Sequence, residues 1–131
     1  MLVRALTSSG GGSETLLWTE SHAGQDDYTF EAQTISLNLS GYSHVLIWCC
    51  YSSYQAVQSA IDDVSYQLIP IDGNQYKIYG GYYTGNNNSF SCRPVTVTSS
   101  GVTFGIGRRS GYSTNYNTRA YPWKIYGVKI S

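Results

Sequence analysis

The sequence predicts an all-β protein, an antiparallel two-sheet β-sandwich of about eight strands with a jelly-roll-like order. Its 131 residues include 13 Tyr and 14 Gly with many Ser, Thr and Asn, a composition that suits strands and turns better than helices. Short stretches of alternating apolar and polar residues recur along the chain, and Gly, Asn, Asp and Ser separate them. No stretch combines the length and the period expected of a helix.

The clearest element is a β-hairpin over residues 93–107, RPVTVTSSGVTFGIG. Its apolar residues fall on odd positions before the turn and on even positions after it, so a loop of even length places them all on one face. Ser100-Gly101 is the predicted two-residue loop, of type I′, in which the glycine takes a positive φ. The predicted apolar face consists of Val95, Val97, Val102, Phe104 and Ile106.

Three further strands are predicted before the midpoint of the chain. Residues 14–19, ETLLWT, form the first, and residues 29–39 form a half-buried strand. Phe30 and Ala32 are at even positions, whereas Ile35, Leu37 and Leu39 are at odd positions. A bulge near Gln33, or a later start of the strand, would explain this change of parity. Residues 44–51, HVLIWCCY, are apolar on both parities, which predicts a central strand covered on both faces.

The remaining elements lie in the second half. Residues 52–60 are assigned to a loop because they are too few and too rich in Ser for a helix. Residues 63–71 and 75–79 are predicted to form a second hairpin around Asp72-Gly73-Asn74, whose register stays open because the loop can have two or three residues. The last strand is residues 122–130, PWKIYGVKI.

The domain organisation is one sandwich over residues 14–131, preceded by residues 1–13 as a flexible tether or a short docking strand. Eight basic and eight acidic residues cancel, which argues against binding to nucleic acid or to anionic membranes. No apolar run approaches the roughly 18 residues of a membrane span, and the apolar stretch within residues 1–13 is too short for a signal peptide. We therefore expect a protein made in a cytoplasm, without membrane insertion.

Catalytic chemistry finds little support in the motifs. His22 and His44 have no recognisable partner in the sequence. Two carboxylate pairs, residues 26–27 and 62–63, consist of adjacent residues, which in a strand point to opposite faces; in a loop they could bind calcium weakly, but solvated loop acids are the favoured interpretation. We expect no catalytic residue, cofactor or metal.

Cys49, Cys50 and Cys92 are an odd number of cysteines at spacings that no disulfide framework uses. Reduced thiols in the core are the favoured interpretation. The alternative, a metal site formed by these cysteines and one histidine, lacks the paired CxxC spacing of tetrahedral sites.

Two long loops, residues 80–89 and 108–121, are rich in Tyr, Asn, Ser and Gly, as binding loops are. The arginines of the second loop suit carboxylates, including those of acidic sugars. The alternative is that these loops are connectors, with some tyrosines at a subunit interface. The predicted ligand-binding residues are Tyr82, Tyr83, Asn87, Arg108, Arg109, Tyr112, Asn115, Tyr116 and Arg119.

Several segments resemble small virion proteins of bacteriophages and prophages of gut Firmicutes: LLWT at 16–19, QTISLNLSGYSHVLI at 33–47, VTVTSSGVTFGIG at 95–107 and YPWKIYGVKI at 121–130. The resemblance implies a role in a particle, tail-associated or fibre-like, in contact with other virion proteins. It also implies location in the virion, after assembly in the host cytoplasm. The adjacent cysteines and the arginines of the second loop have no counterpart in the family pattern.

The leading hypothesis is therefore a noncatalytic phage structural protein that displays a β-sandwich and contacts the host surface, where a glycan is a candidate partner. The strand that is apolar on both faces predicts a homo-oligomer, and analogy with phage fibres favours a trimer. A competing hypothesis is a stand-alone carbohydrate-binding module or lectin-like domain. A small hydrolase would need a clustered acid or nucleophile pair, which the sequence does not offer.

Overall fold

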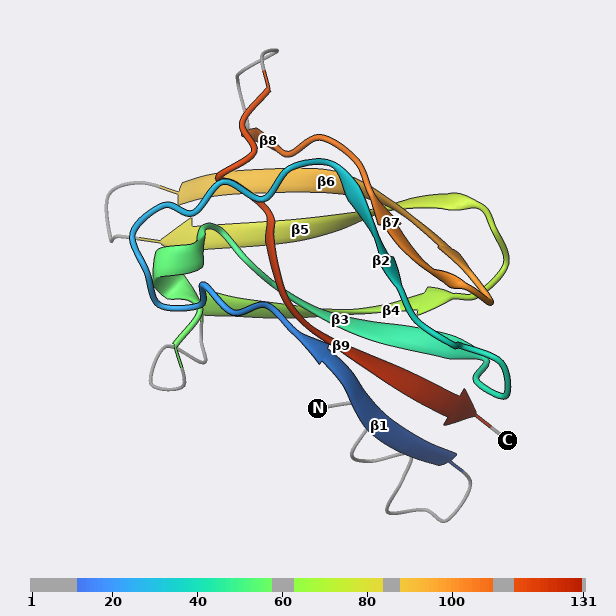
Figure 1. Ribbon diagram of the computed structural model, residues 1–131. Coiled ribbons are helices and arrows are strands. Elements are labelled where there is room, and N and C mark those ends of the chain that lie inside the picture. The colour runs from blue at the N-terminus through green and yellow to red at the C-terminus, as the bar shows by residue number, and fades with distance from the viewer. Residues whose placement is uncertain (1–11, 58–62, 84–87, 110–114, 131) are drawn as a thin grey trace.

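The computed structural model describes residues 12–57, 63–83, 88–109 and 115–130, and shows two antiparallel sheets packed face to face (Figure 1). The first sheet consists of β1 (Gly12–Thr19), β9 (Tyr121–Ile130), β3 (His44–Cys50) and β4 (Val64–Pro70), in that order. The second consists of β2 (Gln33–Ser36), β7 (Gly101–Phe104), β6 (Asn88–Thr98) and β5 (Gln75–Tyr83), and β8 (Arg108–Arg109) pairs with β6. The predicted all-β sandwich is confirmed, with nine strands among the described residues.

The central strand was predicted correctly. β3 lies between β9 and β4. Val45, Ile47 and Cys49 have no exposed surface and belong to the core between the sheets, whereas Leu46 belongs to a separate cluster on the other face. Both parities of β3 are therefore covered, one by the second sheet and one by neighbouring side chains of its own sheet.

The predicted hairpin is confirmed between Val95 and Phe104, but its turn lies one residue earlier than predicted, and Ile106 lies beyond the end of β7 and is only partly buried. Thr98 pairs with Gly101, so the loop is Ser99-Ser100. Neither serine has a positive φ, so the turn is not type I′. Gly101 is required instead by its neighbour, because a Cβ atom on Gly101 would collide with the carbonyl oxygen of Ile35 on β2.

The predicted hairpin around Asp72-Gly73-Asn74 is wrong. β4 is an edge of the first sheet and β5 an edge of the second, so this turn carries the chain from one sheet to the other. The physical reason is that each strand finds a better partner elsewhere: β4 pairs with β3 along its whole length, and β5 pairs with β6 through nine residue pairs. Strands β5, β6 and β7 form a meander. Because of this meander and the crossover, the strand order differs from that of a jelly roll built only of Greek keys.

Several strand boundaries differ from the predictions. β2 starts at Gln33, so the later start is what reconciles the two parities, and Phe30 reaches the core from the preceding loop. β1 begins at Gly12, so residues 12–13 of the predicted tether are strand, while residues 1–11 lie outside the described residues. The predicted loop after β3 contains one 3-10 turn, η1 (Ser53–Gln55).

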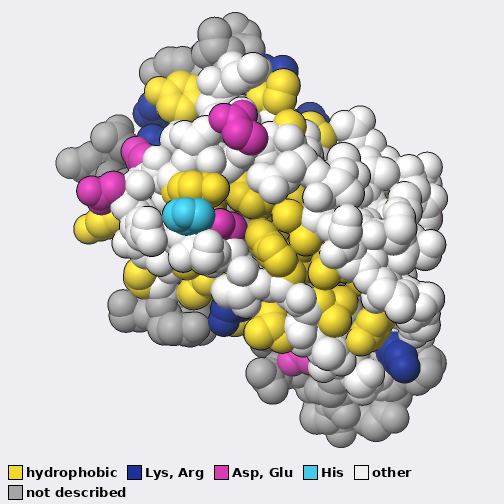
Figure 2. All heavy atoms as spheres, viewed as in Figure 1, with side chains coloured by type: hydrophobic (Ala, Val, Ile, Leu, Met, Phe, Trp, Pro, Cys, Tyr) yellow, Lys and Arg dark blue, Asp and Glu magenta, His cyan; other side chains and the backbone are white. Residues whose placement is uncertain are grey.

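The core between the sheets is closed unevenly. Figure 2 shows hydrophobic side chains in a band along the side of the sandwich where the edge strands β1 and β2 lie. Trp18 on β1 and Ile35 on β2 are only partly buried, in agreement with an open side there. Among the described residues, no helix has the length and apolar character needed to cross a bilayer.

Candidate functional site

Three loop segments meet at one end of the sandwich, at the left in Figure 1. One segment follows β1, the second follows β3, and the third precedes β9. Backbone hydrogen bonds join them: Gly24 N–H donates to the Ser53 carbonyl at 2.8 Å, Phe30 N–H to Asn117 at 2.9 Å, and Ala120 N–H to Tyr51 at 3.1 Å. This end is therefore built from residues that are far apart in the sequence.

Arg93 supports this end from inside the sandwich. It lies on β6 at the same parity as Val95 and Val97, so its side chain points into the core, and it has no exposed surface. Burial lowers its pKa to about 10, which still leaves the guanidinium charged at neutral pH. It donates to the carbonyl oxygens of Gly105 (2.8 Å), Arg119 (2.9 Å), Asn117 (3.0 Å) and Ala120 (3.1 Å).

A cleft of about 350 Å³ opens above these loops, and we call it the Arg119 cleft. Arg119 Nη1 lies 3.2 Å from Asp27 Oδ1, and the guanidinium carbon lies 4.7 Å from the ring centre of Tyr51. The Arg119 side chain is only 15% exposed, so it forms a fixed wall. The lining residues are Asp26, Asp27, Tyr51, Ser52, Tyr54, Gln55 and Arg119.

The η1 turn also lines the cleft and presents Tyr54. The Ser52 N–H donates to Gln55 Oε1 at 3.1 Å, the Ser52 hydroxyl donates to the same atom, and Gln55 N–H donates to the Ser52 carbonyl at 3.2 Å. The bond from the Ser52 N–H to the Gln55 side chain is part of a capping box, which stabilises the turn. Tyr54 is 60% exposed, so its ring is available at the mouth of the cleft.

A hydrogen-bonded group lies behind the same loops. Glu20 is buried and accepts hydrogen bonds from the Tyr121 hydroxyl and the His22 N–H, and His22 Nδ1 lies 2.8 Å from its other oxygen. The His22 ring stacks on Tyr28 with 3.6 Å between ring centres. The expectation that His22 has no partner is therefore wrong, because Glu20 lies only two residues away.

The structure brings together three of the predicted ligand-binding residues. The guanidinium carbons of Arg109 and Arg119 lie 5.7 and 5.5 Å from the ring centre of Tyr116. Asn115 is exposed beside them, and Arg108 pairs with Cys92 in β8. Of the predicted ligand-binding residues that the structure describes, Arg119 alone lines the Arg119 cleft.

The first predicted loop is shorter than expected. Tyr82 and Tyr83 belong to β5, where they pair with Ser89 and Asn88, because the ladder between β5 and β6 extends this far. Their placement in a loop is therefore corrected. Asn87 and Tyr112 lie outside the described residues.

Sequence reasoning did not find most of the cleft. Asp26 and Asp27 were noticed as a carboxylate pair but not connected with Arg119, which is 92 residues from Asp27. Tyr51 was assigned to the central strand, and Tyr54 to a loop without function. One signal in the sequence could have found it. If β9 is antiparallel to β1 and β3, the segments that follow β1 and β3 lie at the same end of the sheet as the segment that precedes β9.

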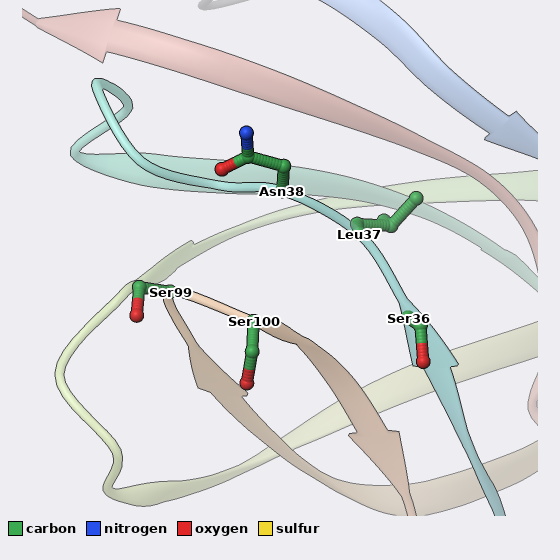
Figure 3. A pocket seen from close by; sticks show the side chains of 5 residues that line it. All are labelled: Ser36, Leu37, Asn38, Ser99 and Ser100. Carbon is green, nitrogen blue, oxygen red and sulfur yellow. The ribbon is translucent and has the colours of Figure 1, made fainter.

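A second hollow, of about 440 Å³, lies at the other end of the sandwich (Figure 3). There the β6-β7 turn faces the segment after β2, and the Leu37 N–H donates to the Ser100 carbonyl at 3.1 Å. The side chains of the three serines point one way and Asn38 points the other (Figure 3). Because these groups do not converge and carry no charge, we regard the Arg119 cleft as the candidate site.

The outer face of the first sheet is a second surface of functional interest. Leu16, Tyr126, Leu46 and Leu68 lie opposite one another across β1, β9, β3 and β4, and Leu46 is buried beneath its neighbours. The rings of Tyr66 and Tyr126 lie 5.1 and 5.6 Å from that of Trp48. We use the name aromatic face for Leu16, Trp48, Tyr66, Leu68 and Tyr126.

The cysteine thiols lie in or next to the core. Cys49 and Cys50 have no exposed surface, and Cys92 is partly buried. Burial raises the pKa of Cys49 well above its usual value and that of Cys50 to about 12. Among the residues that the structure describes, no three His, Cys, Asp or Glu side chains are grouped to hold a metal.

Comparison with known proteins gives no relative: no protein-family model, no curated protein and no solved structure matches this chain. Its function is therefore inferred from its own residues and their geometry.

Proposed function

We propose that this chain is a noncatalytic structural protein of a bacteriophage particle, tail-associated or fibre-like, which assembles into a homo-oligomer through the aromatic face. The single observation that carries the proposal is this apolar surface on the outside of a sheet. Its most exposed member is Leu16, which is 48% exposed on the edge strand β1. The segments that resemble phage virion proteins support the viral part of the proposal.

The composition of the aromatic face supports an interface. Cores of subunit interfaces are enriched in aromatic residues and depleted in charged ones. The ammonium nitrogen of Lys124 lies at this face, 4.6 Å from the ring centre of Trp48 and 4.9 Å from that of Trp123. A cation over aromatic rings can remain in a buried interface at low cost.

The outer face of the second sheet is mixed. Thr98 and Thr103 are exposed near the β6-β7 turn, and the Thr103 hydroxyl lies 2.9 Å from that of Thr34 on β2, whereas Tyr79 on β5 and Phe90 on β6 are exposed aromatic residues. Hydroxyl groups of this kind are well solvated. A closed assembly of few copies avoids open-ended association, and the analogy with phage fibres favours three.

Assembly is tested by mass photometry and light scattering of the purified chain at tens of micromolar. We expect a homo-oligomer of the 14.5-kDa chain, and Leu16→Asp should convert it to a monomer because the carboxylate would be buried at the interface. Phe90→Asp is the matched control, since Phe90 is 58% exposed on the second sheet and should leave the oligomer intact. A monomeric parent protein would refute the proposed assembly.

The viral role is tested separately. Particles induced from a strain that encodes this chain are purified on a density gradient and digested for mass spectrometry. Peptides of this chain should copurify with the particles in constant ratio to the other virion proteins. Their absence from intact particles would refute the role and shift weight to the second candidate, a carbohydrate-binding module, which the Arg119 cleft favours.

A further inference from the structure

We propose that the Arg119 cleft binds a neutral carbohydrate, one or two pyranose units of a surface glycan, with Tyr54 as the stacking platform and Asp26 and Asp27 as hydroxyl acceptors. The inference names the ligand for the host-surface contact in the proposed function. It rests on the proposed function only for the biological role of that ligand. Sugar binding by the purified chain does not require assembly through the aromatic face, which lies on the outside of the first sheet.

Several contacts hold Arg119 in place at the cleft. Arg119 is held by Asp27, by the rings of Tyr51 and Tyr116, and by its own carbonyl group, which accepts a hydrogen bond from the buried Arg93 at 2.9 Å. A site that is already ordered loses little conformational entropy on binding, which matters for weak ligands such as sugars.

Tyr54 has the properties of a stacking platform. It is the most exposed large aromatic side chain among the described residues, and the capping box between Ser52 and Gln55 fixes the turn that carries it. A tyrosine offers an apolar ring and a polar hydroxyl, and a pyranose offers a face of C–H groups and a rim of hydroxyls. The two surfaces are therefore complementary.

The carboxylates supply directional contacts. Asp26 and Asp27 are exposed at the cleft, and Asp27 uses one oxygen for Arg119. An ionised carboxylate accepts several hydrogen bonds, and those from hydroxyl groups are short and charge-assisted. Adjacent carboxylates can thus bind neighbouring hydroxyls of one sugar ring.

The charge balance selects a neutral sugar over an acidic one. Two carboxylates face one guanidinium, and that guanidinium is already paired with Asp27 at 3.2 Å. An acidic sugar would meet like charges and would have to displace Asp27. The volume of about 350 Å³ lies at the small end of ligand sites, which suits one or two rings.

The experiment is a glycan array with the full-length chain, containing neutral and acidic glycans, followed by calorimetric titration of the best ligand. Saturable binding to a neutral glycan is expected. Tyr54→Ala should weaken it at least about tenfold by removing the stacking ring, and Asp26→Asn should weaken it by about the same factor. Tyr79→Ala is the matched control, because Tyr79 is 53% exposed on β5 in the other sheet and should leave binding unchanged.

Three outcomes would overturn the inference: no saturable binding to any glycan, binding to acidic glycans alone, or binding that Tyr54→Ala and Tyr79→Ala affect equally. Thermal melting of each variant within a few degrees of the parent shows that a loss of binding is not a loss of fold. If the chain oligomerises and copurifies with particles but binds no sugar, the inference fails and the proposed function stands.

Discussion

Arg93 shows how a charged side chain can be essential inside an apolar core. Its four carbonyl partners belong to two segments, one after β7 and one before β9, and its guanidinium carbon lies 5.3 Å from the ring centre of Phe30. The planar fork of an arginine can reach several acceptors at once. One residue of β6 thereby orders the loop end that contains the Arg119 cleft.

Arg93→Met should lower the free energy of unfolding by about 3 kcal/mol or more, because four buried carbonyl groups would lose a charged donor. Arg93→Lys should recover only part of this, since an ammonium group has three donors and cannot match the fork. Urea denaturation followed by Trp fluorescence measures both. Lys77→Met, on an exposed position of β5, is the control and should change stability by no more than about 0.5 kcal/mol.

The thiols are a second property at the level of single residues. Cys49 and Cys50 are expected to react with a thiol reagent only after unfolding, because they have no exposed surface and their raised pKa values keep them protonated. The partly buried Cys92 should react first. Mass spectrometry after brief labelling of the native protein measures the order, and rapid modification of Cys49 or Cys50 would contradict their burial.

At the level of elements, the β6-β7 hairpin illustrates how packing moves a turn. The alternation of apolar residues determines the faces, and Val95, Val97, Val102 and Phe104 are all buried as this pattern requires. Alternation does not distinguish between two loops of equal length, because shifting both ends by one residue keeps the same faces inside. The contact with β2 makes that choice, by bringing the Ile35 carbonyl against Gly101.

Gly101→Val should lower stability by about 3 kcal/mol or more, because the added side chain collides with the backbone of β2 and the φ of +158° is unfavourable for a β-branched residue. Calorimetric or circular-dichroism melting measures the change. Gly81→Ala is the control: the nearest atom to its Cβ would be an edge of the Phe90 ring at 3.8 Å, so the variant should melt close to the parent. A Gly101→Val protein as stable as the parent would show that β2 can move away.

For the molecule as a whole, alkaline stability depends on buried weak acids. Burial raises the pKa of Cys49 and Cys50, and burial together with the Glu20 hydrogen bond raises that of Tyr121. A raised pKa in the folded state means that the unfolded chain loses its proton first. The stability that these groups contribute is therefore complete below the unfolded pKa and is lost as the pH rises.

The unfolding free energy should consequently fall from about pH 8.5, the unfolded thiol pKa, toward pH 12, with a further decrease above about pH 10 from Tyr121. Urea midpoints measured from pH 7 to 11 follow this decrease. Cys50→Ala should flatten the first part of the curve and Tyr121→Phe the second. A midpoint that stays constant to pH 11 would contradict the burial of all three groups.

The all-β class, the positions of most strands, the central place of residues 44–51 and the inward faces of the main hairpin can be predicted from the sequence alone. These properties follow from the alternation of neighbouring residues, and that alternation is local. Arg93 has the same parity as Val95 and Val97 and therefore lies on the inner face. A charged residue is not expected in a core, so the sequence alone does not suggest this position. His22 and Glu20 were close enough in the chain to be connected.

Which strands share a sheet, and which loops lie at the same end of the sandwich, depend on tertiary packing. The turn at residues 72–74 has the chemistry of a hairpin, but the choice between pairing and crossing depends on the competing partners β3 and β6, which lie far away in the chain. The Arg119 cleft likewise joins the segments after β1 and β3 to the segment before β9. Turn chemistry and alternation act over a few residues, whereas these choices depend on the free energy of packing the whole sandwich.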